Sequence, residues 1–432
     1  MQKLINSIKV EYLEKFSFIA LLFYAISPVI EYIFKNYSYS NYTHYFSFIL
    51  YPLGVLGIVA YIIYFIKIKK KLNIKDFIPE ILIIILLVIS LISSILSKDV
   101  SLSFLGESYR KEGLIVYIMY IGILLLSSII KDTKYIKYVF KCIILSALII
   151  TILPFFNSNF TYYNFNNVFH NTNHYAYYLM INIMLTAFMF IDNKNIFKKI
   201  IYSLIYIFFL YLIVINDTFG CYLAITVSLI FMFIYSLVKK YKRLDIILLI
   251  LLFAITSFFV SHYDIRLGEK ITIDSEKQTI SQNMVTFSND IKSFITGDNR
   301  SNKAGHGRGY LWKEAINYTL DHPIIGGGME CLNDYYKNNV KYNDRPHNII
   351  LQISSFIGIP GAIIYIALIL YIAITNLKIM NHDTIHIMVY VTAMCYFISS
   401  IFGNSMYYTS PYFMILLGLL VGFNRHKNKK ID

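Results

Sequence analysis

The sequence predicts an all-α integral membrane protein that crosses the bilayer about twelve times and carries one large extracytoplasmic loop near its C-terminal end. Three observations predict this class. Hydrophobic residues make up 57% of the chain and charged residues only 15%, whereas soluble domains are usually about 45–50% apolar and about 25% charged. Apolar stretches of about 20 residues recur, and this is the length that a helix needs to cross the hydrocarbon core. Lysine and arginine gather between these stretches.

The expected spans are helical because lipid offers backbone N–H and C=O groups no other hydrogen-bond partners. We expect spans at about 16–34, 46–66, 77–97, 114–130, 136–156, 175–191, 198–215, 218–238, 245–261, 349–375, 385–402 and 407–423. The chain then divides into residues 1–261 with the first nine spans, an extracytoplasmic loop with short helices at 262–346, and residues 347–432 with three spans and a basic cytoplasmic tail.

The distribution of basic residues between alternate loops predicts the orientation of the chain. One side of the membrane receives the basic residues within 3–15, 67–75, 131–137, 194–199, 239–243 and 425–430. The short loops of the other side contain only Lys35, Lys98, Arg110 and Lys111. Because basic loops tend to stay in the cytoplasm, we expect both termini there and the loops at 98–113, 157–174 and 262–346 on the extracytoplasmic face of the plasma membrane.

The formal net charge of +14 does not indicate a nucleic-acid partner. Nucleic-acid binding needs basic residues gathered on a water-exposed patch, whereas here they flank apolar spans, so the expected partner is the lipid bilayer. The four cysteines lack the spacing of a metal site. His170 and His174 are spaced as two ligands on one helix, but no nearby carboxylate or cysteine completes a site. We therefore expect no metal and no cofactor.

The most informative stretch is residues 305–361. It contains Arg308 just before residues 310–320, whose apolar positions and Trp312 predict a short helix with one broad apolar face. A helix N-terminus exposes unpaired N–H groups and about half a positive charge, so an arginine beside it suits a phosphate group. The alternative is that Arg308 forms an ion pair with Glu314.

Two further elements follow in the same stretch. The run Asp321-His322-Pro323 and the glycines at 326–328 are expected to end this helix and shape a turn, with His322 at the surface. His347 follows Arg345 and stands directly before Asn348 and the next span. Since the unperturbed pKa of histidine is about 6.5, His347 can accept a proton from a hydroxyl at neutral pH. A histidine at the lipid–water boundary without a catalytic role is the alternative.

The short outer loop at 106–113 adds one more candidate. Arg110 is one of the few charged residues on the outer loops, and it either reaches the same cavity or forms a salt bridge with Glu107 or Glu112. Asn173 and His174 lie on another outer loop.

The order of these pieces resembles the O-antigen ligase and polymerase superfamily. In that family an outer loop carries an arginine before a Trp-containing helix, an Asp-His-Pro-like turn into glycines, and then His-Asn followed by Gly-x-Pro-Gly. Here these elements are Arg308 with Trp312, residues 321–328, His347 with Asn348, and residues 358–361. Residues 106–113 and Asn173-His174 show a looser likeness.

The resemblance implies transfer of a glycan from an undecaprenyl-diphosphate-linked donor to a hydroxyl of a glycan, lipid or protein acceptor, without a metal or a nucleotide sugar. It implies that Arg308 holds the diphosphate, that His347 is the base, and that Arg110 is a second diphosphate contact. Arg345, Asn348 and Trp312 are further candidates for substrate binding.

One position departs from the family pattern. The family often has Ser-Arg-Gly where the short loop after the seventh span meets the next span, and here the arginine position is Phe219. Either Arg110 or Arg345 compensates, or this member is catalytically altered, which makes a non-catalytic assembly factor the alternative.

Other readings remain beside glycan transfer by a ligase. A polysaccharide polymerase of the same superfamily shares the donor chemistry and differs in acceptor. A transporter usually shows internal repeats and functional intramembrane charges. This chain has no repeat and only scattered candidates, among them Glu31, Glu80 and Lys141.

Overall fold

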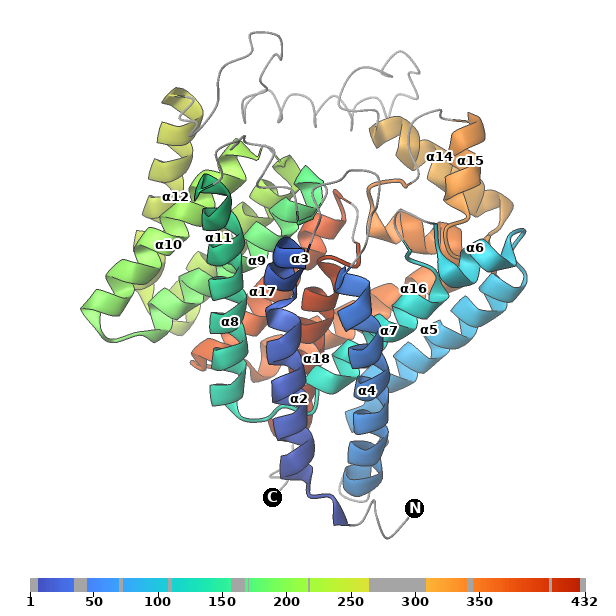
Figure 1. The fold of residues 1–432 in the computed structure, drawn as a ribbon, viewed down its shortest axis with the longest axis horizontal. Coiled ribbons are helices and arrows are strands. Elements are labelled where there is room, and N and C mark those ends of the chain that lie inside the picture. The colour runs from blue at the N-terminus through green and yellow to red at the C-terminus, as the bar shows by residue number, and fades with distance from the viewer. Residues whose placement is uncertain are drawn as a thin grey trace. The chain divides into compact units, whose positions relative to one another are not determined.

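The computed structural model describes residues 7–34, 45–69, 73–107, 111–156, 168–169, 171–216, 218–263, 308–339, 345–403 and 406–427. All regular structure in these ranges is helical (Figure 1). The elements are α2 (Val10–Ala25), α3 (Ser27–Phe34), α4 (Tyr45–Ile68), η2 (Ile74–Phe77), α5 (Ile78–Ile95), α6 (Val100–Leu105), α7 (Leu114–Ser127), α8 (Thr133–Ile152), η3 (Leu153–Phe156), α9 (Thr172–Asp192), α10 (Ile196–Ile215), α11 (Phe219–Lys239), α12 (Arg243–Tyr263), α14 (Arg308–Asp321), α15 (Leu332–Asn339), α16 (Ile349–Ile379), α17 (Thr384–Ser400) and α18 (Ser410–Lys427).

The described helices confirm a polytopic membrane protein. Nine of them are long and apolar enough to cross a membrane, and they coincide with nine of the expected spans. The remaining three expected spans correspond to α7, α17 and α18, which have 14, 17 and 18 residues. The number twelve therefore stays a prediction. The expected outer loop contains α14 and α15, while its residues 264–307 and 340–344 lie outside the described ranges.

The chain forms two compact units. The first consists of Met1–Ile143, Ala315–Asn381 and Ser405–Asp432, and the second of Ile144–Glu314 and His382–Asn404. Each unit is thus assembled from segments that are far apart in the sequence.

Close helix packing characterises the first unit, in which α4 packs along α7 and α7 along α18. Glycines make the first of these contacts possible. A Cβ atom on Gly57 of α4 would lie 2.2 Å from the carbonyl oxygen of Gly122 on α7, and one on Gly122 would lie 2.1 Å from that of Gly54. Small residues allow such close approach of helix backbones, and membrane proteins use them where lipid gives no hydrophobic drive for association.

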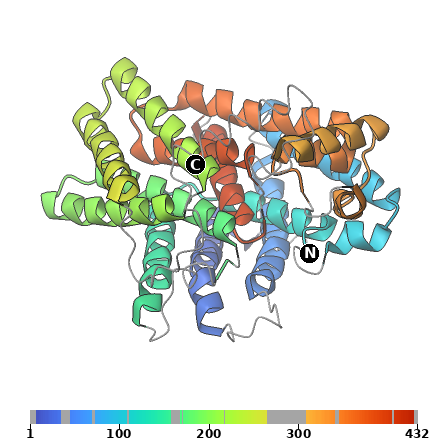
Figure 2. The same ribbon diagram turned by 90° about the horizontal axis from the view of Figure 1, so that it is seen from above.

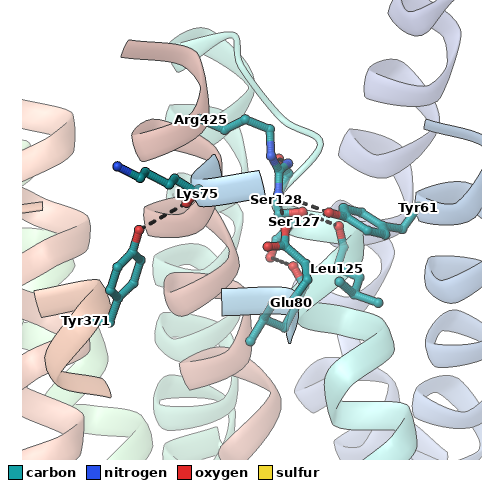
Figure 3. Close-up of polar contacts among 9 residues, drawn as sticks. Tyr61, Lys75, Glu80, Leu125, Ser127, Ser128, Tyr371 and Arg425 are labelled. Carbon is teal, nitrogen blue, oxygen red and sulfur yellow. Dashed lines mark hydrogen bonds and ion pairs between the residues drawn. The ribbon is translucent and has the colours of Figure 1, made fainter. Parts of the chain in front are cut away.

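A buried arginine joins four helices of the first unit. Arg425 of α18 has a fully buried side chain and pairs with Glu80 of α5 (Figure 3). Its guanidinium also donates to the hydroxyl of Tyr61 on α4 at 3.1 Å, and this hydroxyl donates to Glu80 at 2.6 Å. The carbonyl of Ser128, directly after α7, accepts another hydrogen bond from Arg425 at 3.5 Å. Glu80, a candidate for a functional intramembrane charge, therefore has a structural partner.

The same end of the first unit also receives the start of α2. Glu14 of α2 accepts hydrogen bonds from the backbone N–H groups of Lys131 and Asp132 at 2.7 and 2.6 Å. The turn after α7 therefore lies beside four segments of this unit. These are the start of α2, the C-terminal half of α4, the start of α5 and the end of α18. These are segments whose basic residues predict one side of the membrane. The assignment of that side to the cytoplasm stays a prediction.

Replacing Arg425 with methionine should lower the free energy of unfolding by about 3–5 kcal/mol, because the carboxylate of Glu80 would stay buried without its cation. The measurement is the melting temperature of the purified protein in lipid nanodiscs. Lys194→Met is the control, since Lys194 is exposed between α9 and α10. We expect the control to change stability by no more than about 0.5 kcal/mol. Equal melting temperatures for the two variants would contradict the structural role of Arg425.

The second unit is organised around α9, which is buried along its whole apolar window. It packs against α10, α11, α12 and α17, and α10 packs along α12 (Figure 1 and Figure 2). The burial of α9 places His174, near its N-terminal end, inside this unit, while the neighbouring Asn173 is half-buried.

Candidate functional site

The helix predicted after Arg308 is present as α14, and Arg308 is its first residue. The helix ends at Asp321, as expected from the proline two residues later. Arg308 and Trp312 are half-buried, and Ala315 is fully buried on the apolar face. The structure thus places Arg308 at a helix N-terminus, the end of a helix that carries partial positive charge.

Arg308 belongs to the second unit, and its positive charge acts on two polar groups of that unit. These are the hydroxyl of Tyr177 on α9 and the thiol of Cys221 on α11. The Tyr177 hydroxyl donates to the carbonyl of Ser399 on α17 at 2.9 Å, and the Cys221 Sγ atom lies 3.2 Å from the Ser399 Oγ atom. All three side chains are buried. Arg308 therefore lies within electrostatic reach of the polar ends of α9, α11 and α17.

In the second unit, the segment between α10 and α11 contacts the N-terminal end of α9. Asn216, after α10, donates to the carbonyl of Thr172 at 2.9 Å and to the Thr218 hydroxyl at 3.0 Å. The Thr218 hydroxyl in turn donates to Asn173 at 3.5 Å. Phe219, at the position of the family arginine, is half-buried and begins α11. The position that departs from the family pattern is therefore adjacent to the Asn173 element.

The predicted turn at the glycines is present in the first unit. Gly326 and Gly328 have φ angles of 74° and 90°, a conformation that side-chain-bearing residues rarely adopt. His322 is exposed, as expected, and stacks on Tyr318 with 4.5 Å between ring centroids.

This turn docks at a kink in α16 that the sequence analysis did not anticipate. Ile357 and Gly358 leave helical geometry, two residues before Pro360, and a Cβ atom on Gly358 would lie 2.3 Å from the carbonyl oxygen of Ile324. The backbone groups released by the kink form hydrogen bonds with the turn. The N–H groups of Gly327 and Gly328 donate to the carbonyls of Ser355 and Phe356 at 2.9 and 3.0 Å. The N–H group of Ile359 donates to the carbonyl of Pro323 at 2.8 Å. The kink therefore fixes the glycine turn against a long apolar helix.

His347 directly precedes the N-cap of α16. Its side chain is half-buried and its φ angle is 53°, in the left-handed region. Asn348 is the N-cap, and its side-chain oxygen accepts hydrogen bonds from the N–H groups of Ile350 and Leu351 at 3.0 and 3.1 Å. The predicted start of this helix is confirmed, and the side-chain oxygen of Asn348 has a capping role.

Arg345 lies in a buried ion cluster. One terminal nitrogen of its guanidinium pairs with Glu112 and the other with Glu330. The side chains of Arg345 and Glu112 are completely buried, and that of Glu330 is 1% exposed. The other oxygen of Glu112 accepts a hydrogen bond of 2.5 Å from Tyr120. We call Glu112, Arg345 and Glu330 the ion triad. Its geometry favours a role for Arg345 within the protein over direct contact with substrate.

Each residue of the ion triad either has a left-handed backbone conformation or lies within two residues of one that has. Five non-glycine residues in the described ranges have positive φ angles. Three of them are Lys111 beside Glu112, Glu330 itself, and His347 two residues after Arg345. Such residues cost about 1–3 kcal/mol each and persist where the surrounding structure holds them, which is common at functional sites.

Glu330 was not among the predicted site residues, and Glu112 was predicted only as an alternative partner of Arg110. Glu112 and Arg345 are 233 positions apart, so no local spacing connects them. Both glutamates lie in segments with many other charged residues, so composition gave no signal either. Arg110 and His170 lie outside the described ranges, and their predicted or alternative roles are untested.

The long apolar helices of the described residues indicate a multi-pass membrane protein. Residues 204–366 match the sequence model of a family described as O-antigen ligase. No curated protein matches the chain. The match lies in the C-terminal part of the chain and supports the resemblance to the O-antigen ligase superfamily that the sequence indicated. Members of this superfamily are ligases and polymerases of polysaccharide assembly that act in the membrane on lipid-linked glycans.

Proposed function

We propose that this protein is an O-antigen ligase-like glycosyltransferase that moves a glycan from an undecaprenyl-diphosphate-linked donor to an acceptor hydroxyl on the extracytoplasmic face of the plasma membrane. The observation that carries the proposal is the family match over residues 204–366. These residues include Arg308, the glycine turn and His347. The acceptor hydroxyl belongs to a glycan, a lipid or a protein.

In this reaction the acceptor oxygen forms a bond with the anomeric carbon of the glycan while the bond from that carbon to the diphosphate breaks. His347 accepts the proton of the acceptor hydroxyl, which makes the oxygen a better nucleophile. The half-buried position of His347 directly before α16 supports this role, because a partly dry site strengthens the interaction of a base with its proton donor.

The leaving diphosphate gains negative charge as the bond breaks. We assign its stabilisation to Arg308, whose guanidinium offers a planar fork of donors at the N-terminus of α14. Groups aimed at charge that develops in the transition state contribute most to rate. Arg110 is the second diphosphate contact in this proposal, and Trp312 contributes to substrate binding.

Deletion of the gene tests the proposal and separates its two forms. Lipid-linked glycan is extracted from the deletion strain and its length is compared with that of the parent. Accumulated long chains without surface polymer would support a ligase, and accumulated single repeat units would support the polymerase alternative. Unchanged lipid-linked glycan and unchanged surface polymer would contradict both.

A non-catalytic assembly factor is the second candidate, and Phe219 at the position of the family arginine favours it. The deletion strain is supplied with a copy that carries His347→Ala. Surface glycan restored by this copy would favour the assembly role. Glycan restored by the wild-type copy alone would favour transfer catalysed through His347.

A further inference from the structure

The ion triad connects three loops that are separate in the sequence, and two of them contain residues to which we assign a role in transfer. We propose that Glu112, Arg345 and Glu330 are positioning residues, which hold the His347 segment in the geometry that transfer requires. This inference rests on the proposed function. It gives Arg345 a role through its two carboxylates instead of the diphosphate.

The positions of the three residues determine what the triad can hold. Glu112 directly precedes Gly113, the N-cap of α7, and stands two residues after Arg110. Glu330 follows the glycine turn, which is bonded to the kink of α16. Arg345 stands two residues before His347. Any movement of one loop therefore changes an ion pair with another.

The chemistry of arginine makes these contacts directional. The two terminal nitrogens of one planar guanidinium point to two different carboxylates, so the rotation of the group is fixed as well as its position. Tyr120 fixes the second oxygen of Glu112 from within α7. A lysine would keep the charge but would lack the fork, and it could not reproduce both contacts in the same geometry.

The backbone at the triad indicates that this geometry is imposed by the tertiary structure. Lys111, Glu330 and His347 are all in the left-handed region, which the local chain does not favour. A triad side chain is fixed at each of these positions or within two residues of it, and the triad so can maintain conformations that an isolated loop would leave. For His347 the conformation sets the direction in which the side chain leaves the backbone.

A gain in folding stability is a weak explanation for the presence of the ion triad. A buried ion pair often adds no net stability over apolar residues of the same volume, although removal of one partner is harmful. The first unit contains a second buried arginine, Arg425, which pairs with Glu80 and joins helices near their ends. This pair offers a matched comparison, because it has similar chemistry and burial but connects no loop with a proposed catalytic residue.

The test compares Glu112→Gln and Glu330→Gln with Glu80→Gln in purified protein in lipid nanodiscs. The melting temperature, kcat, and KM for the lipid-linked donor are measured for each variant. We expect the two triad variants to lose at least about tenfold in kcat, since small misplacement of a catalytic group has effects of this size or more. We expect their KM to change by less than about threefold, and Glu80→Gln to keep kcat within about twofold of wild type at a similarly lowered melting temperature.

A second readout follows the loops directly. Cys331, next to Glu330, is half-buried and donates to the carbonyl of Ser355 at 3.4 Å, and loss of solvation raises the pKa of its thiol to about 12. Its labelling by a membrane-impermeant maleimide should therefore be slow in the wild type. Labelling should accelerate in Glu330→Gln and remain slow in Glu80→Gln. If neither triad glutamine variant accumulates in the membrane, Arg345→Lys is measured with the same two readouts and the same expected loss in kcat.

Unchanged kcat in the triad variants would overturn the inference, and so would an equal loss of kcat in Glu80→Gln at the same melting temperature. Labelling of Cys331 that does not respond to Glu330→Gln would also count against it. These outcomes differ from a failure of the proposed function, in which the wild-type protein shows no glycan transfer at all. An active wild type with unaffected triad variants would remove only the positioning role.

Discussion

Replacement of His347 with alanine or asparagine should lower kcat for glycan transfer by about 100-fold to 10,000-fold, the usual contribution of a general base. The physical reason is that the acceptor hydroxyl would lose the group that takes its proton. Asparagine is the sharper variant, because it tolerates the left-handed backbone at this position better than alanine does. A loss of activity in His347→Asn at an unchanged melting temperature would therefore report on the imidazole and not on backbone strain.

His322→Ala is the matched control for this experiment. His322 lies in the same outer segment, is exposed, and stacks on Tyr318. We expect its replacement to leave transfer close to the wild-type rate. Full activity in His347→Asn would refute the role of His347 as base, whatever the control shows.

The second large effect is expected at Arg308. Arg308→Ala should lower kcat by about 100-fold to 1,000-fold, the range found when one group that stabilises developing negative charge is removed. Arg308→Lys should retain part of the rate, because an ammonium group keeps the charge but lacks the planar fork that matches two phosphate oxygens. The measurement is transfer from the purified lipid-linked donor at saturating acceptor.

Lys313→Ala provides the control for charge at the same helix. Lys313 is exposed on α14, one and a half turns after Arg308. We expect its loss to change the rate by less than about twofold, in line with the small effects of exposed charges. The role of Arg308 would be wrong if Arg308→Ala matched Lys313→Ala.

Local features of the outer segment were predictable from sequence. The apolar positions of residues 310–320 predicted α14, Pro323 predicted its end, and the glycines predicted a turn. Asn348 before an apolar run predicted the start of α16. Each of these depends on residues within one or two helical turns, whose preferences a single sequence contains.

The kink of α16 shows where local preference was insufficient. Gly358 and Pro360 are present in the sequence, yet the same run reads equally well as one continuous apolar span. The kink is stabilised by hydrogen bonds to the turn at residues 323–328, more than 25 positions earlier in the chain. Only the tertiary contact supplies partners for the backbone groups that the kink releases.

The sequence by itself determined the class of the protein, most of its spanning helices and its resemblance to the family matched by residues 204–366, because apolar length, capping residues and motif order are local properties. The tertiary structure decided which carboxylate each buried arginine pairs with. Arg345 pairs with Glu112 from 233 positions away and Arg425 pairs with Glu80 from 345 positions away, and in both cases the arginine is fully buried. A buried charge requires a partner in space, and that partner is chosen by the packing of helices that are distant in the chain.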